Sequence, residues 1–208
     1  MITLGSSWIY ELQDTGEHVA NCHKVPADSF HKRLLSVKEI LASFESLISL
    51  QAIKDKHILF TISPVRYVRD GLVENNFSKA VLFRVIHDLV EQYPNVYYFP
   101  AYEIVIDELR DYRYFENDFS HPNKLAIDYV WERFVETVPD KESREIISRM
   151  TALKQSISHR PIHPDDPAHQ HFRAQQLDKL KVLKKEFPFL NLEEEFRFFK
   201  NDSASPAD

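Results

Sequence analysis

One short stretch of the sequence combines residue types and a spacing that suit hydrolytic chemistry. Asp118 and His121 are three residues apart, and Pro122 follows directly. A hydrolytic base needs a histidine whose second ring nitrogen is held by an acceptor, usually a carboxylate, and this spacing allows that contact within one turn. Because Pro122 disfavours the α conformation at His121 and suits the first position of a helix, we expect His121 at or just before a helix start. A solvated loop in which Asp118 only caps the backbone is the alternative.

Further polar side chains follow predicted strands and turns. Arg66, Arg69 and Asp70 come after an apolar run. They could contact an anionic substrate, or they could form an Arg–Asp network that fixes the loop. Asn21 and His23 could approach the same site from a predicted hairpin, and a surface pair on an edge strand explains them equally well. We take Arg66, Asp70, Asn21 and His23 as candidate substrate contacts.

The apolar pattern predicts strands that alternate with helices. Compact apolar runs predict strands over three ranges: 1–4, 57–62 and 96–99. Ser36 and Glu39 have the spacing of a capping box, which predicts the start of a first helix. A polar loop is expected to run to about Phe77, where Ser78 caps a second helix. A third helix carries the apolar residues of 126–135.

This alternation predicts a three-layer α/β/α fold with a mostly parallel sheet of the SGNH or flavodoxin type, incomplete at the N-terminus. Ligands of such sheets bind beyond the carboxyl ends of the strands. The site is therefore expected in the loops that begin at Gly5, Ser63 and Pro100, together with the loop 111–122. Charges that alternate in sign over 107–113 are interpreted as a structural lattice around a loop.

The character of the chain changes at Pro139. We divide the sequence into an α/β domain (1–138), a helical C-terminal extension (139–201) and a disordered tail (202–208). Within the extension, 140–157 and 172–200 are predicted to be helical, with a connector rich in Pro and His over 158–171. Near the N-terminus, turn residues at 14–16 predict a hairpin between two extended stretches.

Composition and motif content argue against several classes of protein. The 208 residues carry a net charge of -6, which disfavours a nucleic-acid partner, and the single cysteine, Cys22, cannot form an internal disulfide. The three glycines lie far apart, so dinucleotide and P-loop motifs are absent and no cofactor is expected. Four histidines of 159–171 could suggest zinc, but three prolines and the lack of a cysteine in this stretch favour an exposed connector, so no metal is expected. Without a spanning segment or signal peptide, we expect a cytoplasmic protein.

Longer motifs run through the first 138 residues. They are Val19-Ala20-Asn21-Cys22-His23-Lys24, Thr61-Ile62-Ser63-Pro64-Val65-Arg66, Arg69-Asp70-Gly71, Ser78-Lys79, Tyr98-Phe99-Pro100-Ala101-Tyr102-Glu103 and Asp107-Glu108-Leu109-Arg110-Asp111-Tyr112-Arg113. In this order they resemble the GSCFA family of the SGNH/GDSL-like hydrolase superfamily. The segment Asp118-x-x-His121-Pro122 resembles the last motif of SGNH hydrolases. The resemblance implies that His121 is the general base and that Asp118 orients it.

The sequence also departs from the family pattern. The Gly-Ser-Cys-Phe-Ala motif, whose serine aligns with the SGNH nucleophile, is not in this chain. We therefore expect a chain truncated at its N-terminus. The third superfamily motif normally ends in Gly-x-Asn-Asp, with an oxyanion-binding Asn; here it reads Gly5-Ser6-Ser7-Trp8. Gly5, Ser6 and Ser7 are thus oxyanion candidates. Ser6 or Ser7 as a replacement nucleophile, or a polar turn without a catalytic role, are the alternatives.

The resemblance implies ester hydrolysis or deacetylation of an acylated small molecule or carbohydrate. The serine nucleophile would come from outside this chain, so the chain by itself is expected to be nearly inactive. The alternative is a non-catalytic fragment or binding module. Its partner would be a second copy of the chain or a missing N-terminal half, because an uncovered sheet edge invites pairing.

Overall fold

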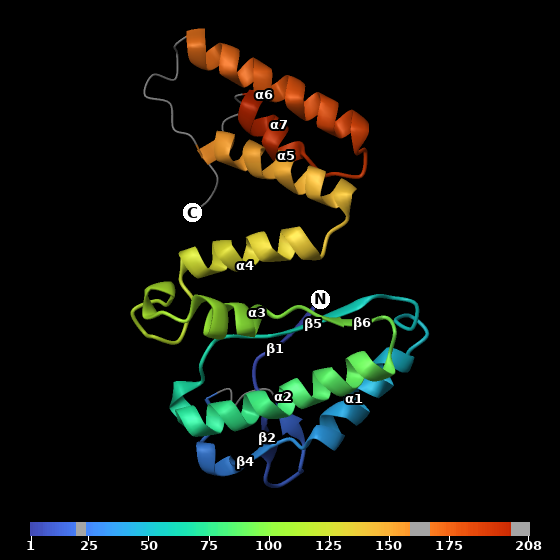
Figure 1. The fold of residues 1–208 in the computed structure, drawn as a ribbon, viewed down its shortest axis with the longest axis vertical. Helices are drawn as coiled ribbons and strands as arrows, with labels where there is room; N and C mark the ends of the chain where they lie inside the picture. The colour runs from blue at the N-terminus through green and yellow to red at the C-terminus, as the bar shows by residue number, and fades with distance from the viewer. Residues whose placement is uncertain (20–23, 159–166, 201–208) are drawn as a thin grey trace. The chain divides into compact units, whose positions relative to one another are not determined.

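The computed structural model describes residues 1–19, 24–158 and 167–200. The chain divides into two compact units, Met1–Thr137 and Val138–Asp208 (Figure 1). The first unit is a mixed α/β structure and the second is built from helices. The candidate residues that the structure describes all belong to the first unit.

A three-stranded parallel sheet forms the centre of the first unit. Its strands are β1 (Ile2–Leu4), β5 (Ile58–Ile62) and β6 (Val96–Tyr98), in the order β1-β5-β6. Leu4 lies opposite Ile62. The predicted parallel sheet is therefore confirmed, and the carboxyl ends of β1 and β5 meet at one edge, where a ligand would be expected.

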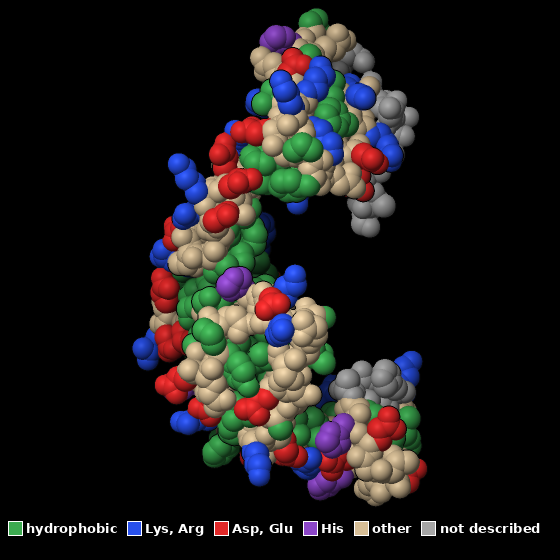
Figure 2. All heavy atoms as spheres, turned by 90° about the vertical axis from the view of Figure 1, so that its right-hand side faces the viewer, with side chains coloured by type: hydrophobic (Ala, Val, Ile, Leu, Met, Phe, Trp, Pro, Cys, Tyr) green, Lys and Arg blue, Asp and Glu red, His purple; other side chains and the backbone are tan. Residues whose placement is uncertain are grey.

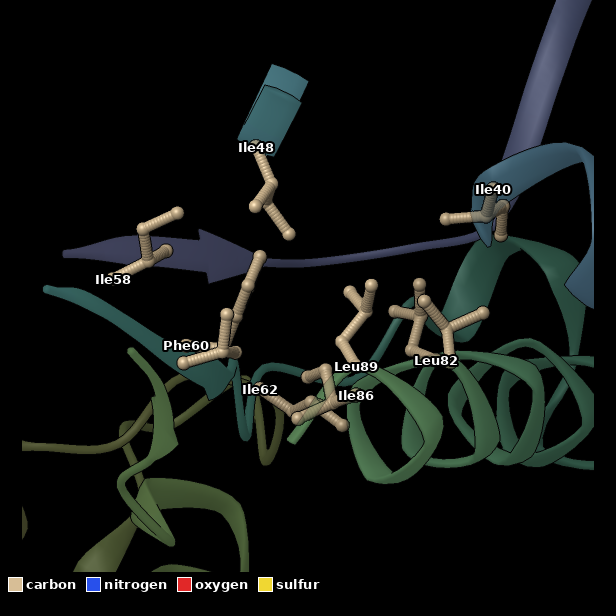
Figure 3. Close-up of a cluster of buried hydrophobic side chains, with 10 residues drawn as sticks. Ile40, Ile48, Ile58, Phe60, Ile62, Leu82, Ile86 and Leu89 are labelled. Carbon is tan, nitrogen blue, oxygen red and sulfur yellow. The ribbon is translucent and has the colours of Figure 1, made fainter. Parts of the chain in front are cut away.

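Helices α1 (Val37–Ser49) and α2 (Leu72–Gln92) lie on one side of this sheet, and α4 (Lys124–Thr137) lies on the other (Figure 1). Side chains of α1, β5 and α2 converge in a shared core (Figure 3). Phe60 is completely buried there, and each such side chain contributes about 1.5–3 kcal/mol relative to an exposed one. On the α4 side, the rings of Phe99 and Phe134 pack edge to face at 5.3 Å.

The predicted capping box at the start of α1 is present. The Ser36 side chain accepts from the Glu39 backbone N–H, and the Glu39 carboxylate accepts from the Ser36 backbone N–H at 2.8 Å. Two of the N–H groups that a helix start leaves unpaired are thereby satisfied.

A small antiparallel sheet adjoins the parallel one in sequence. It consists of β2 (Trp8–Leu12), β3 (His18–Val19) and β4 (Phe30–Leu34), in the order β3-β2-β4. A short 3-10 helix, η1 (Ala27–Ser29), precedes β4. The predicted hairpin is found in its described part as β2 and β3, whereas β4 was not predicted because its Phe-His-Lys-Arg-Leu sequence is mostly polar.

The prediction that Ser78 caps the second helix is wrong. A 3-10 turn, η2 (Val68–Asp70), leads into α2, which begins at Leu72 after Gly71 with φ of 92°. Glycine tolerates this φ without strain. Ser78 lies inside the helix and is buried. The residues between Leu72 and Ser78 were predicted to be a loop because they lack an apolar face. The buried face of this first part of α2 is polar and includes Asn75.

The segment after β6 is helical rather than a loop. A single turn, α3 (Ala101–Glu103), continues into a π-helix, η3 (Ile104–Leu109), and a 3-10 turn, η4 (Tyr112–Tyr114), follows. Ile104 and Val105 are buried. Their burial outweighs the alternating charges that had indicated a loop.

The second unit consists of α5 (Lys141–Ser158), α6 (Pro167–Glu186) and α7 (Glu193–Lys200), which confirms the expected C-terminal helices. Its core contains Leu153, Leu180, Leu183, Phe187, Leu192 and Phe199. The connector expected over 158–171 is wrong from Pro167 onward, since α6 begins there; Pro suits a first helical position. Positions 159–166 and the expected disordered tail lie outside the described residues.

Acidic and basic side chains are interspersed on the face shown in Figure 2. Ion pairs between neighbouring turns, such as Arg84–Asp88 and Lys124–Asp128, follow the same arrangement. Within the described residues, no helix combines the length and the apolar character needed to cross a membrane.

Candidate functional site

Asp118 and His121 contact each other in a tight loop before α4. Asp118 Oδ2 lies 2.5 Å from His121 Nδ1. Asp118 Oδ1 accepts from the backbone N–H groups of Ser120 at 2.9 Å and His121 at 3.0 Å. Phe119 between them has a φ of 55°, which closes the turn. The Asp118 carboxylate therefore contacts the imidazole and also caps the backbone. The contact that a His–Asp pair requires and the backbone cap of the alternative interpretation are both present.

These contacts favour the ionised form of Asp118. The hydrogen bonds, above all the one from the His121 backbone N–H, lower the pKa of the Asp118 carboxyl from 3.8 to about 2. An ionised carboxylate can only accept, so Nδ1 of His121 carries the proton and donates it. In the neutral ring, Nε2 then keeps its lone pair, and the His121 side chain is 61% exposed. This is the tautomer that a general base requires.

The loop is anchored on both sides of the pair. The Glu116 backbone N–H donates to the His121 carbonyl at 2.8 Å, and Ser120 is buried. Asn123 donates its side-chain amide to the Arg113 carbonyl at 2.7 Å and accepts from the Ala126 N–H at 3.3 Å. His121 therefore stands three residues before the first residue of α4, and Asn123 is the residue that caps that helix.

Arg66 joins the loop after β5 to the Asp118–His121 loop. Its backbone N–H donates to the Ser120 carbonyl at 3.3 Å, and its guanidinium donates to the Phe119 carbonyl at 3.2 Å. The guanidinium also lies over the Phe115 ring, 4.7 Å from its centroid. Arg66 follows the carboxyl end of β5, and the structure places it in contact with the histidine loop. This agrees with a site beyond the ends of the strands.

The turn after β1 is packed against α2 through serine hydroxyls. Ser7 is 1% exposed; its backbone N–H donates to Ser78 Oγ at 2.8 Å and its hydroxyl donates to the Ser78 carbonyl at 3.0 Å. The Ser6 hydroxyl accepts from the Trp8 N–H at 3.1 Å and lies 3.1 Å from Ser78 Oγ. The Ser7 hydroxyl has two acceptors on Ser78, the backbone carbonyl and the side-chain Oγ, an arrangement that favours the polar-turn interpretation.

Lys79 was noted only as part of the Ser78-Lys79 motif, and its role in connecting two strand ends was not predicted. It is 2% exposed, and its Nζ donates to the carbonyls of Gly5 and Ser63, each at 2.6 Å. Burial lowers its pKa to about 8. A Cβ on Gly5 would lie 2.5 Å from the Tyr67 hydroxyl, so a larger residue there would require the Tyr67 side chain to shift. The signal was its place among Leu82 and other inward-facing positions of α2, at helical spacing.

The remaining candidates lie apart from the histidine loop or outside the described residues. Asp70 forms an ion pair with Lys32 of β4 and not with an arginine. The Lys32 ammonium also lies 5.0 Å from the centroid of the Trp8 ring. Asp70 therefore ties η2 to the small antiparallel sheet. Asn21 and His23 fall among residues that the structure does not describe.

Comparison with known families shows to which family the chain belongs. The model of the GSCFA family matches residues 1–134. The chain belongs to the GSCFA family. The model of the C-terminal domain of GSCFA proteins matches residues 150–203, so the second unit of this GSCFA chain is also a family feature. No curated protein and no solved structure matches the chain.

One group of side chains in the GSCFA chain has the composition of a metal site. His87, Asp88 and Glu91 on α2 each offer a ligand atom, and these atoms lie within 4.8 Å of one another. Asp88 already pairs with Arg84, and the His87 side chain is 60% exposed. Such groups are common on exposed helix faces, and this one is separate from the histidine loop in sequence and fold.

Proposed function

We propose that this GSCFA chain carries the acid–base half of an SGNH-type ester hydrolase with a three-layer α/β/α domain. The observation that carries the proposal is the Asp118–His121 pair, with its carboxylate on Nδ1. The serine nucleophile is supplied by a polypeptide segment outside this chain. The substrate is an acyl ester, such as the acetyl ester of a small molecule or a carbohydrate.

In this reaction, His121 Nε2 takes the proton of the serine hydroxyl as the serine oxygen attacks the ester carbonyl. The imidazolium is stabilised by Asp118 and returns the proton to the leaving alcohol, which gives an acyl-serine. Water then attacks the acyl-serine, again with His121 as base. The product acid leaves and the serine regains its proton.

The packing of Ser7 supports a nucleophile from elsewhere. A nucleophilic hydroxyl must reach the ester and give its proton to a base. The Ser7 hydroxyl is buried and donates to the Ser78 carbonyl, and Ser6 Oγ is held by Trp8 and Ser78. Both hydroxyls form hydrogen bonds to Trp8 or to Ser78 of α2. Neither could attack an ester unless the turn rearranged.

The proposal is tested by adding the serine segment. The purified chain is assayed with p-nitrophenyl acetate, alone and after fusion of the Gly-Ser-Cys-Phe-Ala segment of another GSCFA protein ahead of Met1. We expect turnover only in the fusion. Turnover by the chain alone that persists in Ser6→Ala and Ser7→Ala but disappears in His121→Ala would overturn the external nucleophile.

A second candidate function is a binding module without catalysis. Strand β1 lies at an edge of the parallel sheet, with β5 as its neighbour. Such an edge presents backbone N–H and C=O groups that another chain can pair with. This function predicts self-association or capture of a complementary segment. Sedimentation that shows a monodisperse monomer at all concentrations would count against it.

A further inference from the structure

We propose that Arg66 and Arg110 form a subsite for a carboxylate or phosphate group on the ester substrate. The inference rests on the proposed hydrolase and deepens it, because it assigns an anionic substrate class to the same site. It starts from a small cavity beside the histidine loop. The lining residues are Arg66, Val105, Ile106, Arg110, Asp111, Tyr112 and Phe115.

The size of the cavity suits one substituent. Its volume is about 190 Å³. Sites for complete small ligands usually have about 300–1,000 Å³, so this cavity would hold one charged group or one ring of a larger molecule. The rest of the substrate would extend from the cavity toward the exposed His121 ring.

The guanidinium of Arg66 is held in place while much of its hydrogen-bonding capacity remains unused. It lies over the rings of Phe115 and Tyr112, 4.7 and 5.7 Å from their centroids. Its side chain makes one hydrogen bond, to the Phe119 carbonyl, and no ion pair with a described residue. Arginine has five N–H donors in a fork that matches carboxylate and phosphate oxygens. A stacked guanidinium without a carboxylate partner is therefore well prepared for an anion.

Arg110 brings a second positive charge to the same cavity. It ends the π-helix η3 in the left-handed conformation, with φ of 44°. Non-glycine residues rarely adopt this conformation, and strained backbone and π-helices both occur often at functional sites. Among the described residues, its guanidinium has no ion-pair partner. Two like charges that share a cavity favour the binding of an anion between them.

The acidic residue of the cavity is already engaged by its neighbour. Asp111 Oδ1 accepts from the Arg113 backbone N–H at 2.8 Å, and Oδ2 lies 3.8 Å from Arg113 Nε. The lining residues thus include two arginines and one aspartate, and the carboxylate of this aspartate already contacts Arg113. The electrostatic balance of the cavity is positive although the whole chain carries a charge of -6.

Arg66 also connects this cavity to the catalytic pair. It binds the carbonyls of Phe119 and Ser120, the two residues between Asp118 and His121. An anionic group on Arg66 would therefore be positioned relative to the His121 ring through one short loop. We expect the subsite to act on substrate affinity rather than on proton transfer.

The test measures binding to the intact chain by NMR, so no nucleophile is needed. D-glucuronate and inorganic phosphate are titrated into the ¹⁵N-labelled protein, with D-glucose as the neutral probe. We expect either anion to shift the signals of residues 66 and 110–115. Arg66→Gln should weaken binding at least tenfold and Arg110→Gln about fivefold. Arg66→Lys should restore part of the loss.

Arg69→Gln is the matched control, because Arg69 is exposed in the same loop and does not line the cavity; it should change affinity less than about twofold. Saturation by glucuronate alone or by phosphate alone assigns the charged group. Equal shifts with glucose, or equal losses in the control, would overturn the subsite. Anion binding without ester turnover in the fusion would support the subsite and contradict the proposed hydrolase. Ester turnover without anion binding would support the hydrolase and contradict the subsite.

Discussion

Asp118 uses its two carboxylate oxygens for different tasks. Oδ1 accepts two backbone N–H groups and shapes the loop, while Oδ2 holds the imidazole of His121. The spacing of the two residues predicted this contact, because both fit on one turn. The positive φ of Phe119, which makes the turn possible, carries no sequence signal, since phenylalanine does not favour it.

The orientation of the imidazole is directly measurable. We predict that neutral His121 carries its proton on Nδ1, because the ionised Asp118 accepts it there. Two-bond ¹H–¹⁵N NMR correlations distinguish the two tautomers. In Asp118→Ala the proton should move largely to Nε2. The exposed pair His18–Glu11, which involves Nε2 of His18, is the internal control and should stay unchanged. A His121 already protonated on Nε2 in the native protein would contradict the pairing.

The low pKa of Asp118 predicts the sign of an acid effect. The carboxyl pKa is about 2 in the folded chain and 3.8 ordinarily, so the unfolded state binds a proton first as the pH falls. The stabilisation by Asp118 is therefore fully present above about pH 4 and is lost as the pH falls through about 2. Thermal unfolding of native protein and Asp118→Asn should converge toward pH 2. A gap that widens on acidification would show the opposite sign.

At the scale of elements, Lys79 links the ends of β1 and β5. Lys79→Met keeps the length of the side chain and leaves the Gly5 and Ser63 carbonyls without their donor. We expect a loss of about 1–3 kcal/mol in the free energy of unfolding, measured in urea. Lys38→Met, an exposed lysine of α1, is the control and should change it by less than about 0.5 kcal/mol. Equal effects of both substitutions would contradict a stabilising link between the ends of β1 and β5 through Lys79.

Lys79 also predicts a pH effect at the alkaline end. Its pKa falls from 10.5 to about 8 on burial, so between these values the unfolded state binds more protons than the folded state. The contribution of Lys79 to stability therefore rises with pH from about 8 to 10.5. The difference in unfolding free energy between native protein and Lys79→Met should grow over this range. A constant difference would mean that folding does not lower the pKa of Lys79.

Elements with strong local signals were predictable, and those shaped by tertiary contacts were not. Residues 58–62 are apolar throughout and form the central strand, and Ser36 with Glu39 marks the start of α1. By contrast, β4 is mostly polar because it pairs with β2 at a partly exposed sheet. The start of α2 was missed because Ser78 satisfies the Ser7 backbone instead of capping a helix.

At the scale of the whole molecule, two units each have their own core. In the second unit, Leu180 is completely buried and Val182 is 59% exposed. We predict that Leu180→Ala costs about 2–5 kcal/mol and that Val182→Ala costs less than about 0.5 kcal/mol. Loss of helical circular dichroism in urea gives both values. Similar costs at the two positions would show that the 138–200 helices do not share this core.

The candidate site was predictable in part for a physical reason. Residues close in sequence, Asp118 and His121, were paired correctly because one turn joins them. The approach of Arg66 to Phe119 and Phe115 depends on how two loops meet beyond the sheet, and composition does not encode that distance. The pairing of Asp70 with Lys32 depends likewise on the position of β4.

The most direct measurement is the dependence of ester turnover on His121 in the fusion that supplies the serine. We predict that His121→Ala lowers kcat/KM for p-nitrophenyl acetate by about a thousandfold or more and Asp118→Asn by about 10²–10⁴-fold. His18→Ala, which removes another exposed carboxylate-paired histidine, should leave it unchanged. Full turnover in His121→Ala, or equal losses in His121→Ala and His18→Ala, would contradict the assignment of His121 as the general base.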